Sequence, residues 1–166
     1  MKSGAPAPFR LDEGLYLENT KVLLPWRTPW KALKKIGRPG VYDRPRARGY
    51  SEIVWRNRTC LGGLKCTVEA EIFYVDAKGP NGDKTLRNLD IILSEPRDAR
   101  DQFRAAEKHL RRVLGKPTVK KMVSDGYNKY PYSEWSLPNA TITLAIGERF
   151  VEYFVFTIAW KKRHDR

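Results

Sequence analysis

The sequence predicts an α+β fold with two tandem αβββ units, antiparallel sheet and helices packed on one face. The first observation is a repeated motif. Residues 30–39 are a basic amphipathic segment closed by Gly-Arg-Pro, and residues 50–52 are Tyr-Ser-Glu. Residues 110–117 contain a second segment closed by Gly-Lys-Pro, and residues 132–134 are again Tyr-Ser-Glu. The second observation is that the expected strands form hairpins with no helical crossover between them, which is typical of α+β proteins.

The length of the chain fits one domain. At 166 residues it can bury a core without disulfides or metals, and its hydrophobic content is 41%. We therefore expect a single domain over residues 1–166, with internal repeats at approximately 25–94 and 97–162. The two hairpin sheets could join edge to edge into one continuous sheet.

The charge predicts an anionic partner. The chain has 32 Lys and Arg residues against 19 Asp and Glu residues, so its formal net charge is +13. Such an excess attracts nucleic acid, lipid head groups or acidic proteins. The first residues lack the apolar core of a signal peptide, and no apolar run is long enough to span a membrane. We therefore expect a cytoplasmic protein without a membrane partner.

Two helices are predicted, one before each set of strands. The first is expected to begin at Thr28-Pro29, because Thr is a good N-cap and Pro is tolerated in the first turn. Its apolar face would carry Trp26, Trp30 and Leu33, and Gly37 would end it in a left-handed conformation. The second helix is expected over about 98–114, where Asp98 and Asp101 complement the helix dipole.

Alternating hydrophobic residues predict the strands. They are expected at 50–60, 65–77, 85–94, 133–136, 140–146 and 149–161, after an edge strand within 11–24. Gly147-Glu148 is expected to form the last hairpin turn. Residues 38–49 and 120–132 are interpreted as basic loops.

The residue types argue against catalysis. No nucleophile elbow, phosphate-binding loop or zinc signature occurs, and neither histidine has a suitable neighbour in sequence. His109 is expected to be a solvated helix residue. Glu69 and Glu71 could act as an acid–base pair, but they fit the water-facing side of an amphipathic strand. We expect no enzyme activity, no cofactor and no metal site. Cys60 and Cys66 could face each other across a hairpin, where free thiols are favoured over a disulfide in the cytosol.

The two loops after the Gly-x-Pro motifs are the candidate partner-binding regions. Both combine cations with aromatic side chains, the composition of binding hot spots, and arginine holds carboxylates or phosphates bidentately. The predicted partner-binding residues are Arg44, Arg46, Arg48, Tyr50, Arg56 and Arg58 in the first region, and Lys120, Lys121, Tyr127, Lys129, Tyr130 and Tyr132 in the second. The alternative is a solvated basic surface with half-buried tyrosines.

The repeated segments also carry a resemblance. A helix ending in Leu-Gly-x-Pro and followed by a meander, as at residues 110–117, resembles small bacterial proteins encoded beside secreted toxins. The tandem plan is similar to that of beta-lactamase inhibitory proteins, which bind a partner with the exposed face of their sheet. The resemblance implies a stoichiometric inhibitor, an immunity protein, with no catalytic residues. A charge of +13 would suit an acidic face of a cognate toxin domain.

Two other functions remain open. A basic nucleic-acid-binding module could use the same loops, although no helix-turn-helix, RNP-type strand or KH loop is recognisable. A subunit of a larger assembly would need an exposed apolar patch, for which Val151, Tyr153 and Val155 are the candidates.

Overall fold

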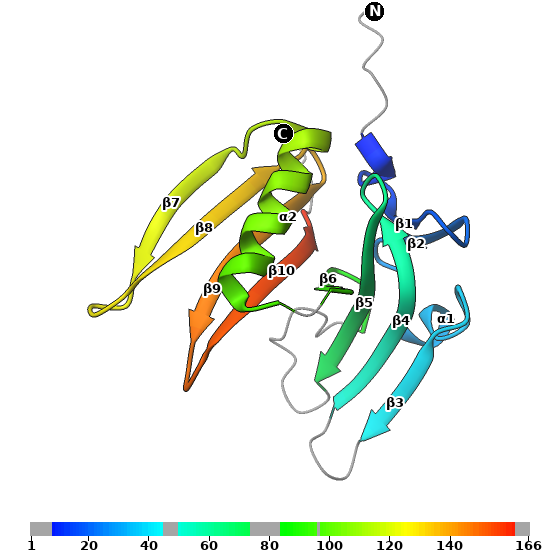
Figure 1. Ribbon diagram of the computed structural model, residues 1–166. Coiled ribbons are helices and arrows are strands. Elements are labelled where there is room, and N and C mark those ends of the chain that lie inside the picture. Colours follow the sequence, from blue (N-terminus) through cyan, green and yellow to red (C-terminus); the bar gives the residue numbers. More distant parts are fainter. Residues whose placement is uncertain (1–7, 45–49, 74–83, 96, 162–166) are drawn as a thin grey trace, which may run out of the picture.

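The computed structural model describes residues 8–44, 50–73, 84–95 and 97–161 (Figure 1). The fold is α+β, with antiparallel strands in an eight-stranded and a two-stranded sheet, so the predicted fold class is confirmed at this level. The elements are the 3-10 turn Pro8–Arg10, β1 (Gly14–Leu17), β2 (Val22–Pro25), α1 (Trp30–Leu33), β3 (Gly40–Arg44), β4 (Tyr50–Cys60), β5 (Leu64–Phe73), β6 (Asn88–Leu93), α2 (Ala99–Leu114), β7 (Val119–Ser124), β8 (Lys129–Ser136), β9 (Ala140–Glu148) and β10 (Glu152–Trp160).

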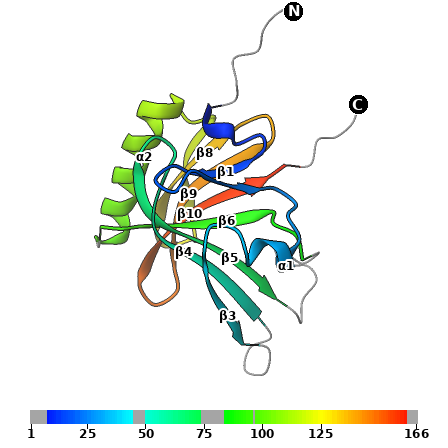
Figure 2. The same ribbon diagram turned by 90° about the vertical axis from the view of Figure 1, so that its right-hand side faces the viewer.

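The large sheet joins the two halves of the chain at its centre. Its strand order is β3-β4-β5-β6-β10-β9-β8-β7, so the last strand of each half lies in the middle. The join is the β6–β10 pair (Figure 2). In this pair, Leu89 lies opposite Ile158. Four strands follow each helix instead of the three expected, because β3 and β7 form within the segments interpreted as loops.

Both helices contact the same face of this sheet. Directly paired residues of a sheet point to the same side. Following the paired residues from strand to strand shows that Ser51 on β4 and Ser133 on β8 lie on the same face. The indole of Trp30 in α1 donates a hydrogen bond to Ser51 Oγ. The hydroxyl of Ser133 donates to Glu107 of α2. We call the opposite side of the sheet the open face, since no described helix packs on it.

The first helix is a single turn, shorter than expected. Thr28 does not cap it, because the Thr28 hydroxyl donates to the Pro25 carbonyl instead. The indole of Trp26 donates to the Leu11 carbonyl at 2.9 Å and does not share a helical face. The β1–β2 hairpin supplies apolar cover, and its side chains Leu15, Leu17 and Leu24 are fully buried. Gly37 has a φ of 70°, so the left-handed position predicted there is confirmed.

The second helix agrees with the sequence pattern. Asp98 accepts a hydrogen bond from the Asp101 amide at 2.8 Å and caps α2. Phe103, Ala106 and Leu110 are its buried stripe. His109 is not a solvated residue, since its Nε2 donates to the Leu61 carbonyl at 2.8 Å. That bond fastens α2 to the turn between β4 and β5.

Cys60 and Cys66 are free and fully buried, with their sulfur atoms 3.5 Å apart. The hydrogen bond between them and burial raise the pKa of the Cys60 thiol. Among the described residues, no helix is long and apolar enough to cross a lipid bilayer.

Candidate partner-binding surface

The first predicted cluster lies at the β3 edge of the sheet. Arg44 in β3 pairs through its backbone with Tyr50 in β4, and the side chains of both lie outside the described residues. Arg46 and Arg48 fall in the segment 45–49, which also lies outside them. The backbone pairing of Arg44 with Tyr50 therefore places this part of the cluster on the outermost strand pair of the sheet.

The other two arginines of this cluster have different surroundings. Arg56 is exposed, donates to the Tyr42 hydroxyl at 3.1 Å and lies over the Tyr42 ring at 5.8 Å. Arg58 is half-buried and donates to the Gly37 carbonyl at 3.2 Å. Arg58 therefore supports the loop after α1, whereas Arg56 is available at the surface.

The second predicted cluster lies at the opposite edge and divides between the two faces of the sheet. Lys120 forms an ion pair with Glu107 of α2 at 2.7 Å, on the helix side. Lys121 points to the open face, where its ammonium lies 5.1 Å from the centre of the Tyr132 ring. The Tyr132 hydroxyl donates to Glu134 at 2.6 Å, and this bond raises the pKa of Tyr132.

The two clusters do not form one site. The β3–β4 and β7–β8 pairs are the outermost pairs of the sheet, and five strand spacings separate β4 from β8. At about 4.8 Å per spacing, this is roughly 24 Å along the sheet. Each edge nevertheless carries a cation over a tyrosine ring, Arg56 on Tyr42 and Lys121 on Tyr132.

Between these edges, the open face carries a group of carboxylates. Glu52 lies directly opposite Glu71, and Glu69 lies directly opposite Asp90. Like charges at paired positions repel each other. Partial burial, followed by the charges of its neighbours, raises the pKa of Glu69 to about 7. The same causes raise the pKa of Asp90 to about 6. This part of a strongly basic protein is therefore locally acidic.

The most exposed apolar side chains gather at two hairpin turns. Tyr127 in the β7–β8 turn is 98% exposed, and Phe150 in the β9–β10 turn is 91% exposed. Val151 and Tyr153 beside it are 73% and 50% exposed. Figure 1 shows both turns on the same side of the molecule. We call these four residues the tip surface.

The last hairpin turn differs from the expected one. β9 continues through Gly147 to Glu148, and residues 149–151 make the turn. Gly147 is instead a place of close approach, because a Cβ atom there would lie 2.5 Å from Cζ of Tyr153. The shift of the turn by two residues is what places Phe150 at its apex.

Hydrogen bonds hold the β7–β8 turn in one conformation. Asp125 Oδ1 accepts from the amides of Tyr127 and Asn128, at 2.9 and 2.8 Å. These bonds lower the pKa of Asp125. The side-chain amide of Asn128 donates to Glu148 of β9 at 3.3 Å, which ties the two turns together. Tyr127 is thus an exposed ring on a fixed backbone.

A charged network fastens the same turns to α2. The Tyr130 hydroxyl, also predicted as a binding residue, donates to Glu148, which raises the pKa of Tyr130 to about 12. The ring of Tyr130 is buried, and the guanidinium of Arg100 lies 6.0 Å from its centre. Arg100 binds both carboxylate oxygens of Glu152, at 2.6 and 2.9 Å. The pKa of Glu152 is accordingly lowered.

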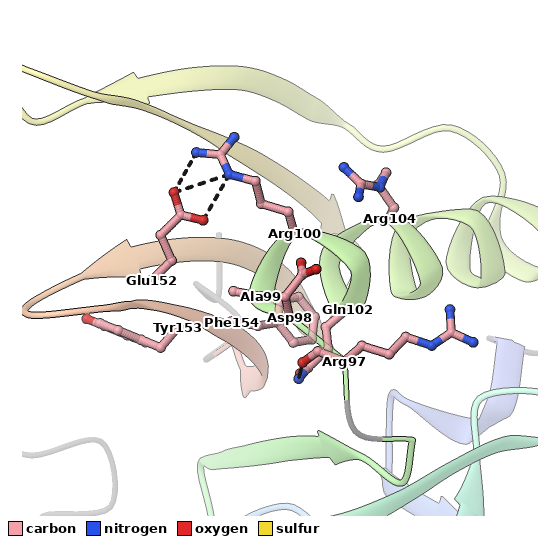
Figure 3. A pocket seen from close by; sticks show the side chains of 9 residues that line it. All are labelled: Arg97, Asp98, Ala99, Arg100, Gln102, Arg104, Glu152, Tyr153 and Phe154. Carbon is pink, nitrogen blue, oxygen red and sulfur yellow. Dashed lines mark hydrogen bonds and ion pairs between the residues drawn. The ribbon is translucent and has the colours of Figure 1, made fainter.

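A hollow of about 640 Å³ adjoins this network at the start of α2 (Figure 3). Its charged lining residues include three arginines, Arg97, Arg100 and Arg104. Arg97 pairs with Glu95 and Arg104 with Asp101, both at exposed positions. Figure 3 shows their guanidinium groups lying apart from the Arg100–Glu152 pair. Tyr153 of the tip surface also lines the hollow, so apolar and basic groups are contiguous here.

Of the predicted residues, Tyr127 belongs to this surface directly, and Lys129 is exposed at the adjacent start of β8. Phe150, Arg97 and Arg104 were not expected. The sequence signal for Phe150 was its own bulky aromatic side chain, which directly follows Arg149.

Comparisons with known proteins assign no family to this chain. No protein family, curated protein or solved structure matches it. Among the described residues, no group of three or more His, Cys, Asp or Glu side chains is arranged to hold a metal ion.

Proposed function

We propose that this chain is a non-enzymatic binding protein, an immunity protein that neutralises a cognate bacterial toxin by stoichiometric binding of its acidic surface or active site. The observation that carries the proposal is the tip surface: Tyr127 and Phe150 stand almost fully exposed on two turns joined to each other and to α2. Exposed apolar side chains gathered on one side of a molecule are typical of an interaction site.

The rigidity of the tip surface supports a binding role. A backbone that is already fixed loses little freedom on association, so more of the contact energy of the side chains it carries contributes to affinity. The Asp125 hydrogen bonds and the Arg100–Glu152 pair hold the backbone that presents Tyr127 and Phe150. Aromatic and arginine side chains together are also the residue types that dominate binding energy at protein interfaces.

The distribution of charge supports an acidic partner at this surface. Arginines line the hollow beside the tip surface, and the exposed side of α2 continues the positive charge with Lys108 and Arg111. Complementary charge speeds encounter and disfavours wrong partners. The carboxylates on the open face would repel the same partner, so they direct it toward the helix side.

We also propose that the two halves are related units. The strand order supports this relation. From the outer edge to the centre of the sheet, the first half runs β3, β4, β5, β6 and the second half runs β7, β8, β9, β10. The indole of Trp55 donates to the Ile36 carbonyl at 2.8 Å, and the indole of Trp135 donates to the Gly115 carbonyl at 3.0 Å. Each tryptophan thus fastens a strand to the end of the preceding helical segment.

The test of the function is binding to the product of an adjacent toxin gene. Mixing the two purified proteins should give a one-to-one complex of nanomolar affinity with loss of toxin activity. Phe150→Ser should weaken the complex by about 30-fold or more, because hot-spot residues contribute at least about 2 kcal/mol. Met122→Ser is the matched control, since Met122 is also exposed and apolar but lies on β7.

The results separate this proposal from its alternative. Equal effects of the two substitutions would contradict a role for the tip surface. Nucleic-acid binding is favoured by the positive charge of α2, and it predicts affinity for duplex DNA or RNA that falls steeply with salt. Tight binding to nucleic acid, with none to the toxin, would replace the proposal by that alternative.

A further inference from the structure

The exposed side of α2 carries an ordered stripe of cations. Arg100, Arg104, Lys108 and Arg111 are all exposed and follow one another at intervals of four, four and three residues. At about 1.5 Å per residue, the cations are about 6, 6 and 4.5 Å apart along the axis. The opposite side of α2 is buried against the sheet, so this stripe is the side that remains available.

The stripe lies along two adjoining hollows, together called the depression, which reach the tip surface at Tyr153. The hollow of about 640 Å³ is lined by Arg100 and Arg104. A second hollow of about 290 Å³ is lined by Arg104, Lys108 and Arg111. Because the two hollows share Arg104, they adjoin along nearly three turns of α2. Tyr153 lines the far end of the first hollow.

We propose that this depression holds an acidic amphipathic helix of the partner. Its carboxylates would lie on Arg104, Lys108 and Arg111, and its apolar side chains on Tyr153 and Phe150. The proposal rests on the proposed function, because it names the element of the partner that the tip surface recognises.

The spacing of the cations favours a helix as the occupant. Side chains at i, i+4 and i+7 of a helix line up along one face at the same rise as the stripe on α2. Lys108 forms no ion pair with any described residue, so it can take a partner carboxylate without losing one. Within the described part of the chain, Arg104 pairs with Asp101 alone, and an exposed ion pair of this kind exchanges readily.

The surroundings favour a protein over a nucleic acid. Asp101, Glu107 and Glu152 are interspersed with the cations along the depression. These carboxylates would repel a continuous phosphate backbone, which presents charge at every nucleotide. The phosphate backbone of a nucleic acid offers no apolar group to cover Phe150 and Val151, which are exposed. Leucine side chains of a partner helix would bury them.

A synthetic peptide tests the inference without the toxin. The probe is an 18-residue helical peptide with Glu at positions i, i+4, i+7 and i+11 and Leu on an adjoining face. A scrambled peptide of the same composition is the comparison. Titration should show at least about tenfold tighter binding of the patterned peptide, with chemical-shift changes along α2 and at the tip surface. Equal binding of the two peptides would overturn the inference.

Charge-reversal variants locate the site. Arg104→Glu with Lys108→Glu should weaken binding of the peptide and of the toxin by about 30-fold, by converting attraction into repulsion. The control is Lys31→Glu with Lys35→Glu, which changes the net charge equally at exposed positions near α1. It should change affinity by less than about threefold at physiological salt, because charges beyond about 8 Å are screened.

The two proposals can fail separately. If Phe150→Ser abolishes toxin binding while the α2 variant leaves it unchanged, the helix inference is wrong and the proposed function stands. If no toxin binds but the patterned peptide does, with the expected loss in the α2 variant, the site is real and the immunity role is wrong. Binding of a nucleic-acid duplex, but not the peptide, through the same lysine and arginine would also overturn the inference.

Discussion

Replacing Glu69 by Gln should make the folded protein more stable at alkaline pH. Glu69 is half-buried on β5, directly opposite Asp90 and close in space to Glu52 and Glu71. Burial and these charges raise its pKa from 4.5 to about 7. The folded chain therefore holds a proton on Glu69 more tightly than the unfolded chain does.

The direction of the pH effect follows from that difference. Protonation of Glu69 favours the folded state, so its contribution to stability falls as the pH rises from about 4.5 to about 7. The full rise in pKa would correspond to a limit of about 3.4 kcal/mol. Because the side chain keeps contact with water, screening reduces this to about 1 kcal/mol. Glutamine has nearly the same shape and no charge, so it should recover this loss.

Thermal unfolding at pH 8 and at pH 5 measures the effect. At pH 8, Glu69→Gln should raise Tm by about 2–4 °C, the shift expected for about 1 kcal/mol in a domain of this size. At pH 5 the two proteins should unfold within about 1 °C of each other, because pH 5 lies near the start of the range from 4.5 to about 7 in which the contribution of Glu69 is lost.

Glu13→Gln is the control for this experiment. Glu13 is exposed, and its hydrogen bond from Arg10 lowers its pKa, so the same chemical change should not raise Tm at pH 8. If Glu69→Gln lowers Tm at pH 8, or changes it equally at both pH values, then the carboxylates on the open face do not oppose one another as inferred.

Two further predictions concern packing and the end of α2. Gly14→Ala should destabilise the fold by more than about 2 kcal/mol, because the new Cβ would lie 2.1 Å from the Leu24 carbonyl oxygen and the backbone must move. Gly63→Ala, where the space is open and only a φ of 88° opposes the change, should cost about 1 kcal/mol, and urea unfolding will compare the two. Trp135→Phe should cost about 1–3 kcal/mol in the same assay, since it removes the bond to the Gly115 carbonyl and leaves a void. An unchanged midpoint would mean that this bond does not fasten β8 to α2.

The sequence predicted the elements that have a regular pattern of apolar residues. β4 spans Tyr50–Cys60 and α2 spans Ala99–Leu114, both within a residue of expectation, because each has a regular apolar face and clear end signals. The strands β3 and β7 were missed because they lie at the sheet edges. Edge strands need few buried residues, and the charges on β7 are those of a typical protected edge.

Tertiary packing explains why the first helix is shorter than the sequence predicts. The periodic spacing of Trp26 and Trp30 predicted a longer first helix, but short helices depend on packing for stability. Here the Trp26 indole bonds to Leu11, and the β1–β2 hairpin covers the sheet where further helical turns would lie. No local sequence pattern predicts that this packing will win over a longer helix.

The candidate site was harder to predict because it unites distant segments. Arg100 meets Glu152 across 52 positions of sequence, and the join of the two half-sheets brings α2 to the last hairpin. Charge and aromatic content predicted Tyr127 as a partner-binding residue, and the structure shows its side chain 98% exposed. They could not indicate that Phe150 would stand at a turn, because that depends on where β9 ends.

The two faces of the sheet differ in charge, and this difference sets how an acidic partner can approach. The open face concentrates Glu52, Glu69, Glu71 and Asp90, whereas the helix side presents the cations of α2. A partner with a negative surface therefore loses free energy on one side and gains it on the other. Repulsion from the open face should weaken below about pH 6, as Glu69 and Asp90 become protonated. Attraction to the arginines of α2 does not change over the same pH values, because arginine stays charged. Orientation of an acidic partner should thus be most selective above pH 7, where a partner on the wrong face meets Glu69 and Asp90 in their ionised forms.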